Sequence, residues 1–138
     1  MAAHLAVSDV RPSVVLCSSS LRTRETLAAI LPALGDALEV RIERALYGAG
    51  AAELLQRLRQ VPNRASSVML IGHNPGIQEL AFGLAASGSA LAALREKFPT
   101  GALATVDVEV ERWRDADNGN ATATTLVTPR SLETGAGA

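Results

Sequence analysis

Two short segments of the sequence hold the residue types best suited to binding phosphate. The first is Ser18-Ser19-Ser20-Leu21-Arg22-Thr23, and the second is Gly72-His73-Asn74-Pro75-Gly76. An arginine guanidinium can bind phosphate oxygens through two parallel hydrogen bonds, and a histidine ring can donate a hydrogen bond to the same group. The two segments therefore indicate an anion-binding site that includes Arg22, His73 and Ser18.

Each of these residues also has a purely structural explanation. Arg22 could be an ordinary surface arginine, although a cation in the first turn of a helix is unfavourable without a neighbouring anion, and the same holds for Arg24. The serines could cap the helix that follows them. His73 could bond a nearby carbonyl, but the glycine and the Pro-Gly beside it permit a tight turn and close backbone approach. Asn74 either contributes to phosphate binding or only holds that turn.

Both segments follow predicted strands and open predicted helices. The apolar runs at residues 14–18 and 68–72 predict buried strands, and leucine and isoleucine at helical spacing predict helices over 27–34 and 77–84. In a parallel sheet, ligands bind at the carboxyl ends of the strands, and helix N-termini there offer free N–H groups to an anion. We therefore expect the two segments to line one crevice.

The remaining pattern predicts an α/β protein. Gly35 fits the C-cap of the first long helix. We expect a three-layer αβα sandwich with a mostly parallel sheet and a C-terminal antiparallel hairpin, built as one domain over residues 1–130 with a flexible tail at 131–138. The other elements expected are a strand at 38–42, helices around 54–58 and 90–97, and hairpin strands at 104–110 and 122–128.

Composition narrows the classes of function. The formal net charge is -1, so the chain has no bulk attraction to nucleic acid or to anionic membranes. The sequence has one cysteine, Cys17, which excludes an internal disulfide and a cysteine-rich zinc site. Because Cys17 lies in an apolar run, we expect it to be a small buried hydrophobic residue. No apolar stretch has the length of a membrane span, and the N-terminus has no signal-peptide pattern. We therefore expect a cytoplasmic protein.

The two segments resemble motifs of the histidine phosphatase (phosphoglycerate-mutase-like) superfamily. Residues 18–26 resemble its serine-proline, leucine-arginine, glutamine-threonine stretch, and residues 72–76 resemble its second-histidine motif. Further stretches, in order along almost the whole chain, are similar to the bacterial SixA branch of phosphohistidine phosphatases. They are Val14-Val15-Leu16-Cys17-Ser18-Ser19, Ala45-Leu46-Tyr47, Lys97-Phe98-Pro99-Thr100-Gly101-Ala102, Trp113 and Thr128-Pro129-Arg130-Ser131-Leu132.

The resemblance implies covalent catalysis. Members of the family transfer the phosphoryl group to a histidine in an N-terminal Arg-His-Gly or Arg-His-Ala motif, and then hydrolyse that intermediate. By resemblance, Arg22 would clamp the phosphoryl oxygens and His73 would stabilise the charge of the transition state. The resemblance implies no metal ion and no cofactor. The substrate it implies is phosphohistidine on a protein, or a small phosphorylated molecule.

The sequence departs from the family near its start. It contains no Arg-His pair, and the segment from Met1 matches the end of the family's first helix, so we expect the first strand of the family fold, with its nucleophile, to be missing. His4 lies in a helical stretch and cannot replace that nucleophile. Loss of an interior strand would expose two apolar sheet edges. Glu43 is the nearest candidate for a general acid by position, with a solvated surface role as its alternative.

Three interpretations therefore stay open. The chain could be a metal-independent phosphohistidine phosphatase whose recorded start is too late, a pseudo-phosphatase that holds phosphate or a phosphoprotein without turnover, or a truncated domain without independent function. For the chain as given, we predict no turnover through a covalent phosphohistidine. The oligomeric state is left open, since an exposed sheet edge would make a dimer unsurprising.

Overall fold

The computed structural model describes residues 1–134, and these residues divide into two compact units. The first unit comprises Met1–Ala49 and Pro62–His73. The second unit comprises Gly50–Val61 and the chain from Asn74 onward. The expectation of a single domain over residues 1–130 stays a prediction.

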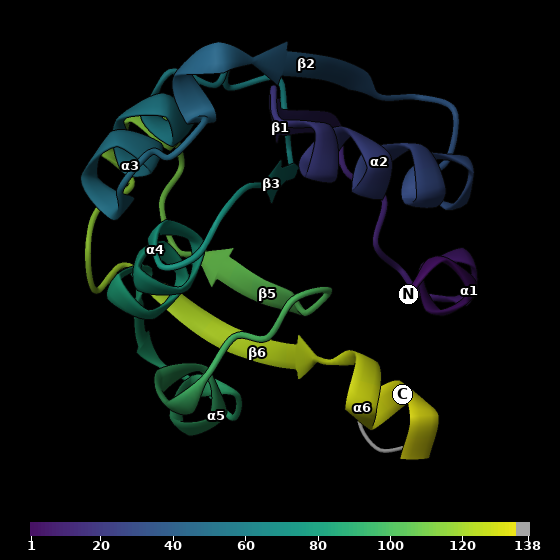
Figure 1. Ribbon diagram of the computed structural model, residues 1–138. Coiled ribbons are helices and arrows are strands. Elements are labelled where there is room, and N and C mark those ends of the chain that lie inside the picture. The colour runs from purple at the N-terminus through teal and green to yellow at the C-terminus, as the bar shows by residue number, and fades with distance from the viewer. Residues whose placement is uncertain (135–138) are drawn as a thin grey trace. The chain divides into compact units, whose positions relative to one another are not determined.

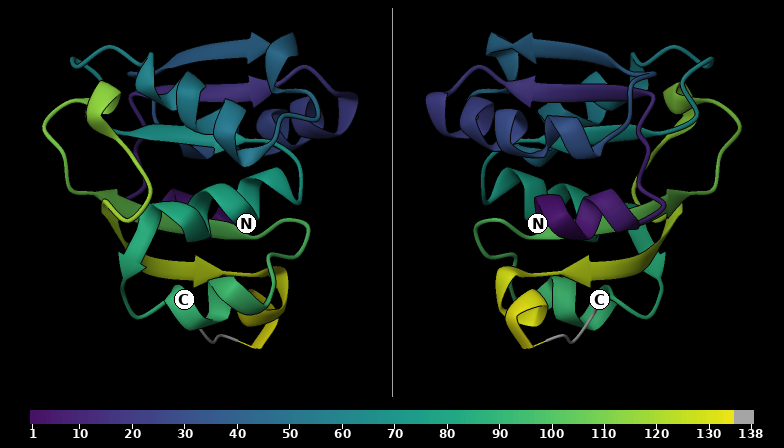
Figure 2. Two further views of the ribbon diagram at one scale, coloured as in Figure 1. Left: turned by 90° about the vertical axis from the view of Figure 1, so that its left-hand side faces the viewer. Right: turned by 90° about the vertical axis from the view of Figure 1, so that its right-hand side faces the viewer.

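A parallel three-stranded sheet forms the centre of the first unit, with the strand order β2-β1-β3. Figure 2 shows its three strands pointing in the same direction. The elements of this unit are α1 (Ala2–Val7), β1 (Val14–Ser18), α2 (Leu21–Ile30), η1 (Leu31–Ala33), β2 (Glu39–Glu43), η2 (Arg44–Leu46) and β3 (Val68–Ile71).

The core of the first unit forms around β1, as its apolar run predicts. Every residue of β1 is buried, because the strand has a neighbour on each side. From α2, Leu27 and Ile30 are buried at helical spacing. Gly35 has a φ of +89°, a left-handed conformation that suits glycine and that confirms the predicted end of this helical segment.

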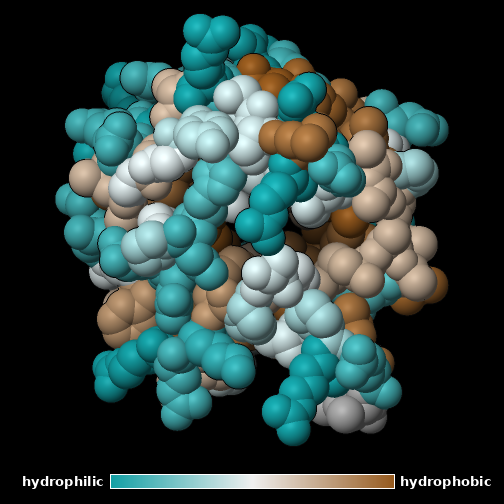
Figure 3. Space-filling model, in the orientation of Figure 1, coloured by the Kyte–Doolittle hydropathy of each residue, from teal (hydrophilic) through white to brown (hydrophobic). Residues whose placement is uncertain are grey.

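The strand β2 lies at the edge of this sheet and is mostly exposed. Its apolar residues Val40 and Ile42 share one face and are 37% and 51% exposed. Apolar surface is visible at the top of Figure 3, over the region where Figure 1 labels β2. The charged residues Glu39 and Arg41 alternate with them, and the guanidinium of Arg41 donates to the carboxylate of Glu39 at 2.7 Å.

The second unit contains a mixed three-stranded sheet with the strand order β4-β6-β5. Figure 1 shows β5 and β6 running in opposite directions, and β4 pairs with β6 in parallel. A cluster of Ala90, Leu94 and Ala123 forms part of its core. The elements are α3 (Ala51–Arg59), α4 (Gly76–Leu84), β4 (Ala85–Ser87), α5 (Leu91–Glu96), β5 (Leu103–Val108), η3 (Trp113–Asp115), β6 (Ala121–Val127) and α6 (Pro129–Thr134).

The structure confirms the α/β class and the C-terminal antiparallel hairpin, and it adds detail to both. The strands form two sheets, because β3 pairs only with β1 and β5 pairs only with β6 within the described residues. The short strand β4 was not predicted. The predicted tail is helical at its start, since α6 runs to Thr134, and the rest of it, residues 135–138, lies outside the described residues.

Candidate functional site

The three strands of the parallel sheet end at one edge, and the segments that carry Arg22 and His73 begin there. In the parallel register Ser18, the last residue of β1, lies beside Glu43, the last residue of β2, while Cys17 lies beside Ile71, the last residue of β3. The segments that follow these strands therefore leave the sheet at the same edge. One of them carries Arg22 and another carries His73, as the sequence predicts.

A hydrogen bond joins Ser18 and His73, two of the predicted site residues. The hydroxyl Oγ of Ser18 lies 2.8 Å from Nε2 of His73. Ser18 is fully buried at the end of β1, whereas His73 is half-buried two residues after β3. The strand end thus holds the imidazole ring through Nε2, and the His73 side chain stays partly accessible to solvent.

The surrounding bonds indicate which nitrogen of His73 is available for a ligand. Oγ of Ser18 accepts a hydrogen bond from the backbone N–H of Ser20 at 3.4 Å, so its own hydrogen can be donated to Nε2 of His73. In a neutral ring the proton is then on Nδ1, which makes no hydrogen bond with any residue of 1–134. That N–H can donate to an anion.

The loop between β1 and α2 is fixed by side-chain hydrogen bonds. Ser20 is the N-cap of α2 and its Oγ accepts the N–H of Thr23 at 3.2 Å. The buried hydroxyl of Thr23 donates to the carbonyl of Ser18 at 2.7 Å. The predicted capping role of a serine is therefore confirmed, and Ser18 is held from both its backbone and its side chain.

The two arginines at the start of α2 differ in their partners. Nε of Arg24 donates to the carbonyl of Ser19 at 3.1 Å. Arg22 is exposed, and its guanidinium makes neither a hydrogen bond nor an ion pair within the part of the chain that the structure describes. A free guanidinium in the first turn of a helix has no favourable interaction with the helix dipole. Arg22 is thus available for an anion, whereas Arg24 stabilises the loop.

Tyr47 is a further residue of this sheet edge, and the sequence did not single it out as a site residue. Its ring centroid lies 5.4 Å from that of His73, with the two planes tilted by 52°. Tyr47 is the C-cap of the short helix η2, which follows β2, and it is 65% exposed. Its position in the segment that follows a strand of the same sheet is the signal that could have identified it.

The other titratable candidates of the first unit are less suited to chemistry. Burial raises the pKa of the Cys17 thiol, which disfavours its reactive thiolate form. Glu43 is half-buried at the end of β2, and its role as a general acid stays a prediction. His4 lies in α1, on the helix where the sequence places it.

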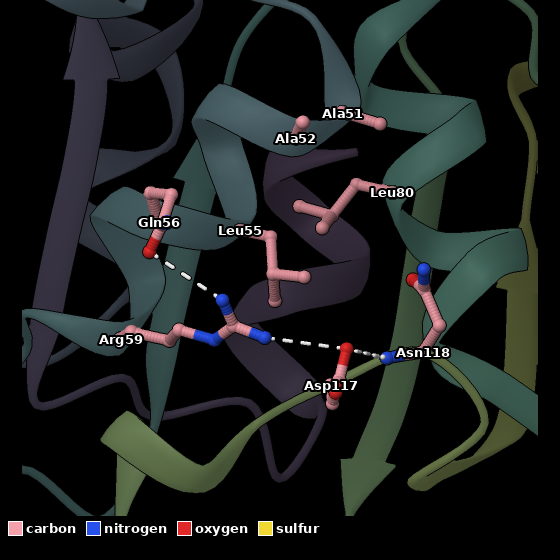
Figure 4. Close-up of a pocket in the computed structure, with 8 residues that line it drawn as sticks. All are labelled: Ala51, Ala52, Leu55, Gln56, Arg59, Leu80, Asp117 and Asn118. Carbon is pink, nitrogen blue, oxygen red and sulfur yellow. Dashed lines mark hydrogen bonds and ion pairs between the residues drawn. The ribbon is translucent and has the colours of Figure 1, made fainter.

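A hollow in the second unit has a volume of about 440 Å³ and is drawn in Figure 4. Arg59 is the only cation that lines it. Its Nε donates to the carbonyl of Ala116 at 2.7 Å, and another of its nitrogens lies 3.2 Å from a carboxylate oxygen of Asp117. Because this guanidinium is already paired, the hollow offers little to an anion. The residues that line it are Ala51, Ala52, Leu55, Gln56, Arg59, Leu80, Asp117 and Asn118.

Metal-ligand clusters and membrane-spanning helices are both absent from residues 1–134. Within them, His, Cys, Asp and Glu side chains form no group of three or more that could hold a metal ion. None of the helices described there is long and apolar enough to span a membrane.

Comparison with known proteins places the chain in a family. No family model matches it. It is 32% identical over 120 residues to an uncharacterised protein of Mycobacterium tuberculosis, a match that covers 84% of this chain and 73% of that protein. A structure assigned to phosphohistidine phosphatase SixA from Nakamurella multipartitia superposes with a TM-score of 0.74 at 31% identity, over 86% of this chain and 71% of that one. The chain belongs to the SixA branch of the histidine phosphatase superfamily.

A second structure assigned to SixA, from Agrobacterium tumefaciens, superposes with a TM-score of 0.73 at 25% identity, over 93% of this chain and 75% of that one. Family membership agrees with the resemblance of the sequence motifs. The SixA-like stretch at residues 97–102 contains Gly101 at a φ of +80°, where a side chain would contact the ring of Pro129. In the last motif, Thr128 and Ser131 exchange backbone-to-hydroxyl bonds that cap α6.

Asn74, the last of the predicted phosphate-binding residues, is placed in the second unit. Its side-chain amide nitrogen donates to the carbonyl of Phe98, within the same unit. This bond links two SixA-like motifs, the second-histidine motif and the stretch at residues 97–102. A structural role for Asn74 is therefore visible, and its contribution to phosphate binding stays a prediction.

Proposed function

We propose that the protein is a phosphatase of the SixA type, acting on phosphohistidine of a protein or on a small phosphorylated molecule. Its phosphate site comprises Arg22, His73, Ser18 and Asn74. The observation that carries this proposal is the bond from the buried Ser18 hydroxyl to His73, which orients the ring at the carboxyl end of the parallel strands. A cytoplasmic location is part of the same proposal.

The proposed chemistry separates phosphate binding from phosphoryl transfer. Arg22 neutralises the charge of the phosphoryl oxygens, and Nδ1 of His73 donates a hydrogen bond to one of them. In the family, a histidine of an Arg-His motif is the nucleophile. This chain has two histidines, of which His73 is held by Ser18 and His4 lies in α1. We therefore propose that residues 1–138 bind phosphate, and that turnover by the phosphatase requires an Arg-His nucleophile that these residues do not contain.

Titration with orthophosphate or orthovanadate tests the binding half of the proposal. Because hydrogen bonds to a charged group contribute about 1.5–3 kcal/mol, Arg22→Ala should weaken binding roughly ten- to hundredfold. Arg64→Ala is the matched control, since it removes one positive charge from an exposed side chain of the same unit. Equal affinities of the wild type and Arg22→Ala would show that the site has been misplaced.

Turnover is tested with p-nitrophenyl phosphate and by trapping acid-labile phosphate on the protein. Neither p-nitrophenol nor labelled protein should form with the chain as given. Turnover that disappears in His73→Ala and persists in His4→Ala would contradict the proposal that the nucleophile is missing.

A second candidate function is a phosphate-binding or phosphoprotein-binding module without turnover. The placement of both histidines favours it, since neither follows an arginine at a strand end. The coding sequence upstream of Met1 distinguishes the two candidates. An in-frame strand ending in Arg-His-Gly or Arg-His-Ala supports the phosphatase, whereas a stop codon directly before Met1 supports the binding module.

A further inference from the structure

Tyr47 lies at the candidate phosphate site without an evident structural task. The backbone beneath it is held by two other features, the burial of Leu46 at 3% exposure and the bond from the N–H of Tyr47 to the carbonyl of Arg44 at 3.1 Å. The Tyr47 ring contributes little to the core, because it is 65% exposed. Its contact with His73 is the feature that needs an explanation.

The geometry of the two rings suits the binding of a third ring. Aromatic rings with centroids about 4.5–7 Å apart attract each other in tilted or offset arrangements. Tyr47 and His73 form such a pair at 5.4 Å. Ser18 holds Nε2 of His73, and the phosphoryl group binds at His73 in the proposed function. The exposed ring of Tyr47 is therefore an aromatic surface next to the group that carries the phosphoryl.

We propose that Tyr47 is a specificity-determining residue that packs against the leaving group, and that the site prefers a phosphoryl group attached to a planar aromatic ring. This inference rests on the proposed function. The ring would be an imidazole in phosphohistidine or a phenol in an aryl phosphate, and a flexible alkyl group would gain less from the same surface. The tyrosine hydroxyl is not required, because the face of the ring provides the contact.

The magnitude follows from the strength of aromatic pairs. A pair contributes about 0.5–1.5 kcal/mol beyond the area that it buries, which corresponds to roughly a two- to tenfold difference in dissociation constant. We therefore expect phenyl phosphate to bind the protein roughly two- to tenfold more tightly than methyl phosphate. Orthophosphate has no leaving group, so its affinity should not depend on the Tyr47 ring.

The test measures the affinities of orthophosphate, methyl phosphate and phenyl phosphate by calorimetry for the full chain and three variants. Tyr47→Phe should keep the preference for phenyl phosphate, and Tyr47→Leu should lose it while binding orthophosphate as the wild type does. Ile42→Ala is the control, because it removes an exposed apolar side chain from the adjacent strand β2, and it should keep the preference.

Each outcome bears on a different claim. Unchanged orthophosphate affinity in Tyr47→Leu shows that the variant is folded. If the wild type binds orthophosphate but does not distinguish the two esters, or if Tyr47→Leu keeps the preference, the role of Tyr47 is refuted while the phosphate site stands. If Tyr47→Leu weakens all three ligands equally, Tyr47 acts only by supporting His73. If orthophosphate does not bind at all, the proposed function fails, and this inference with it.

Discussion

Within the first unit, Ser18 is the only residue whose side chain forms a hydrogen bond with His73, and Ser18→Ala removes that bond. The hydroxyl has two partners, Nε2 of His73 at 2.8 Å and the N–H of Ser20 at 3.4 Å, and Ser18 itself is fully buried. The longer bond is weak, so most of the effect comes from the shorter one. A net hydrogen bond contributes about 1 kcal/mol, and a buried group left unpaired costs about 1–3 kcal/mol.

His73 is half-buried, so water can partly replace the lost partner, which places the effect near the lower end of that range. We therefore expect Ser18→Ala to lower the free energy of unfolding by about 1–2 kcal/mol. Because the imidazole ring is no longer oriented, orthophosphate should also bind more weakly, by roughly a factor of two to ten.

Urea unfolding followed by circular dichroism measures the first effect, and calorimetric titration measures the second. Ser19→Ala is the control, because Ser19 is the adjacent serine and is half-buried, and its hydroxyl bonds to no residue of the described chain. That variant should stay within about 0.5 kcal/mol of the wild type. If Ser18→Ala were as stable as Ser19→Ala and bound phosphate equally well, the Ser18–His73 bond would not organise this site.

Three further predictions concern other parts of the chain. Burial raises the pKa of the Cys17 thiol, so the folded protein favours its neutral form. Reaction of Cys17 with a disulfide reagent at pH 8 should therefore be slow and should accelerate on addition of urea. Equal rates with and without urea would contradict this. Gly88→Ala should lower the melting temperature much more than Gly119→Ala, because a Cβ at Gly88 would overlap the carbonyl of Ala123, whereas at Gly119 only the positive φ is unfavourable. Leu94→Ala should lower the free energy of unfolding by about 2–5 kcal/mol, since Leu94 is fully buried in the core cluster of the second unit. A loss under about 1 kcal/mol would show that the cluster is loosely packed.

The sequence predicts those elements whose signal is local. The run of apolar residues at 14–18 is bounded by a proline and a serine cluster, and β1 has those bounds. The hairpin of β5 and β6 follows from the alternation of Ala104, Val106 and Val108 with polar residues and from the threonine-rich run at 122–128. The strand β4 has no such pattern in Ala85-Ala86-Ser87, and only its pairing with β6 makes it a strand.

The site shows the same division between local and long-range information. The sequence places Arg22 and His73 after strands, because each follows an apolar run. It cannot give the order β2-β1-β3, which is set by how the strands pair along the whole unit. That order determines the contact of Tyr47 with His73 and the bond of His73 with Ser18, so neither could be predicted from spacing.

The position of Ser18 at the end of a fully buried strand separates the motions of the site by timescale. Ser18 itself can move away only if the end of β1 opens, and such opening belongs to the rare fluctuations that control amide hydrogen exchange of core strands. The exposed side chains of Arg22 and Tyr47 instead reorient within picoseconds to nanoseconds. One half of the site is thus nearly static while the other adapts to each ligand that arrives.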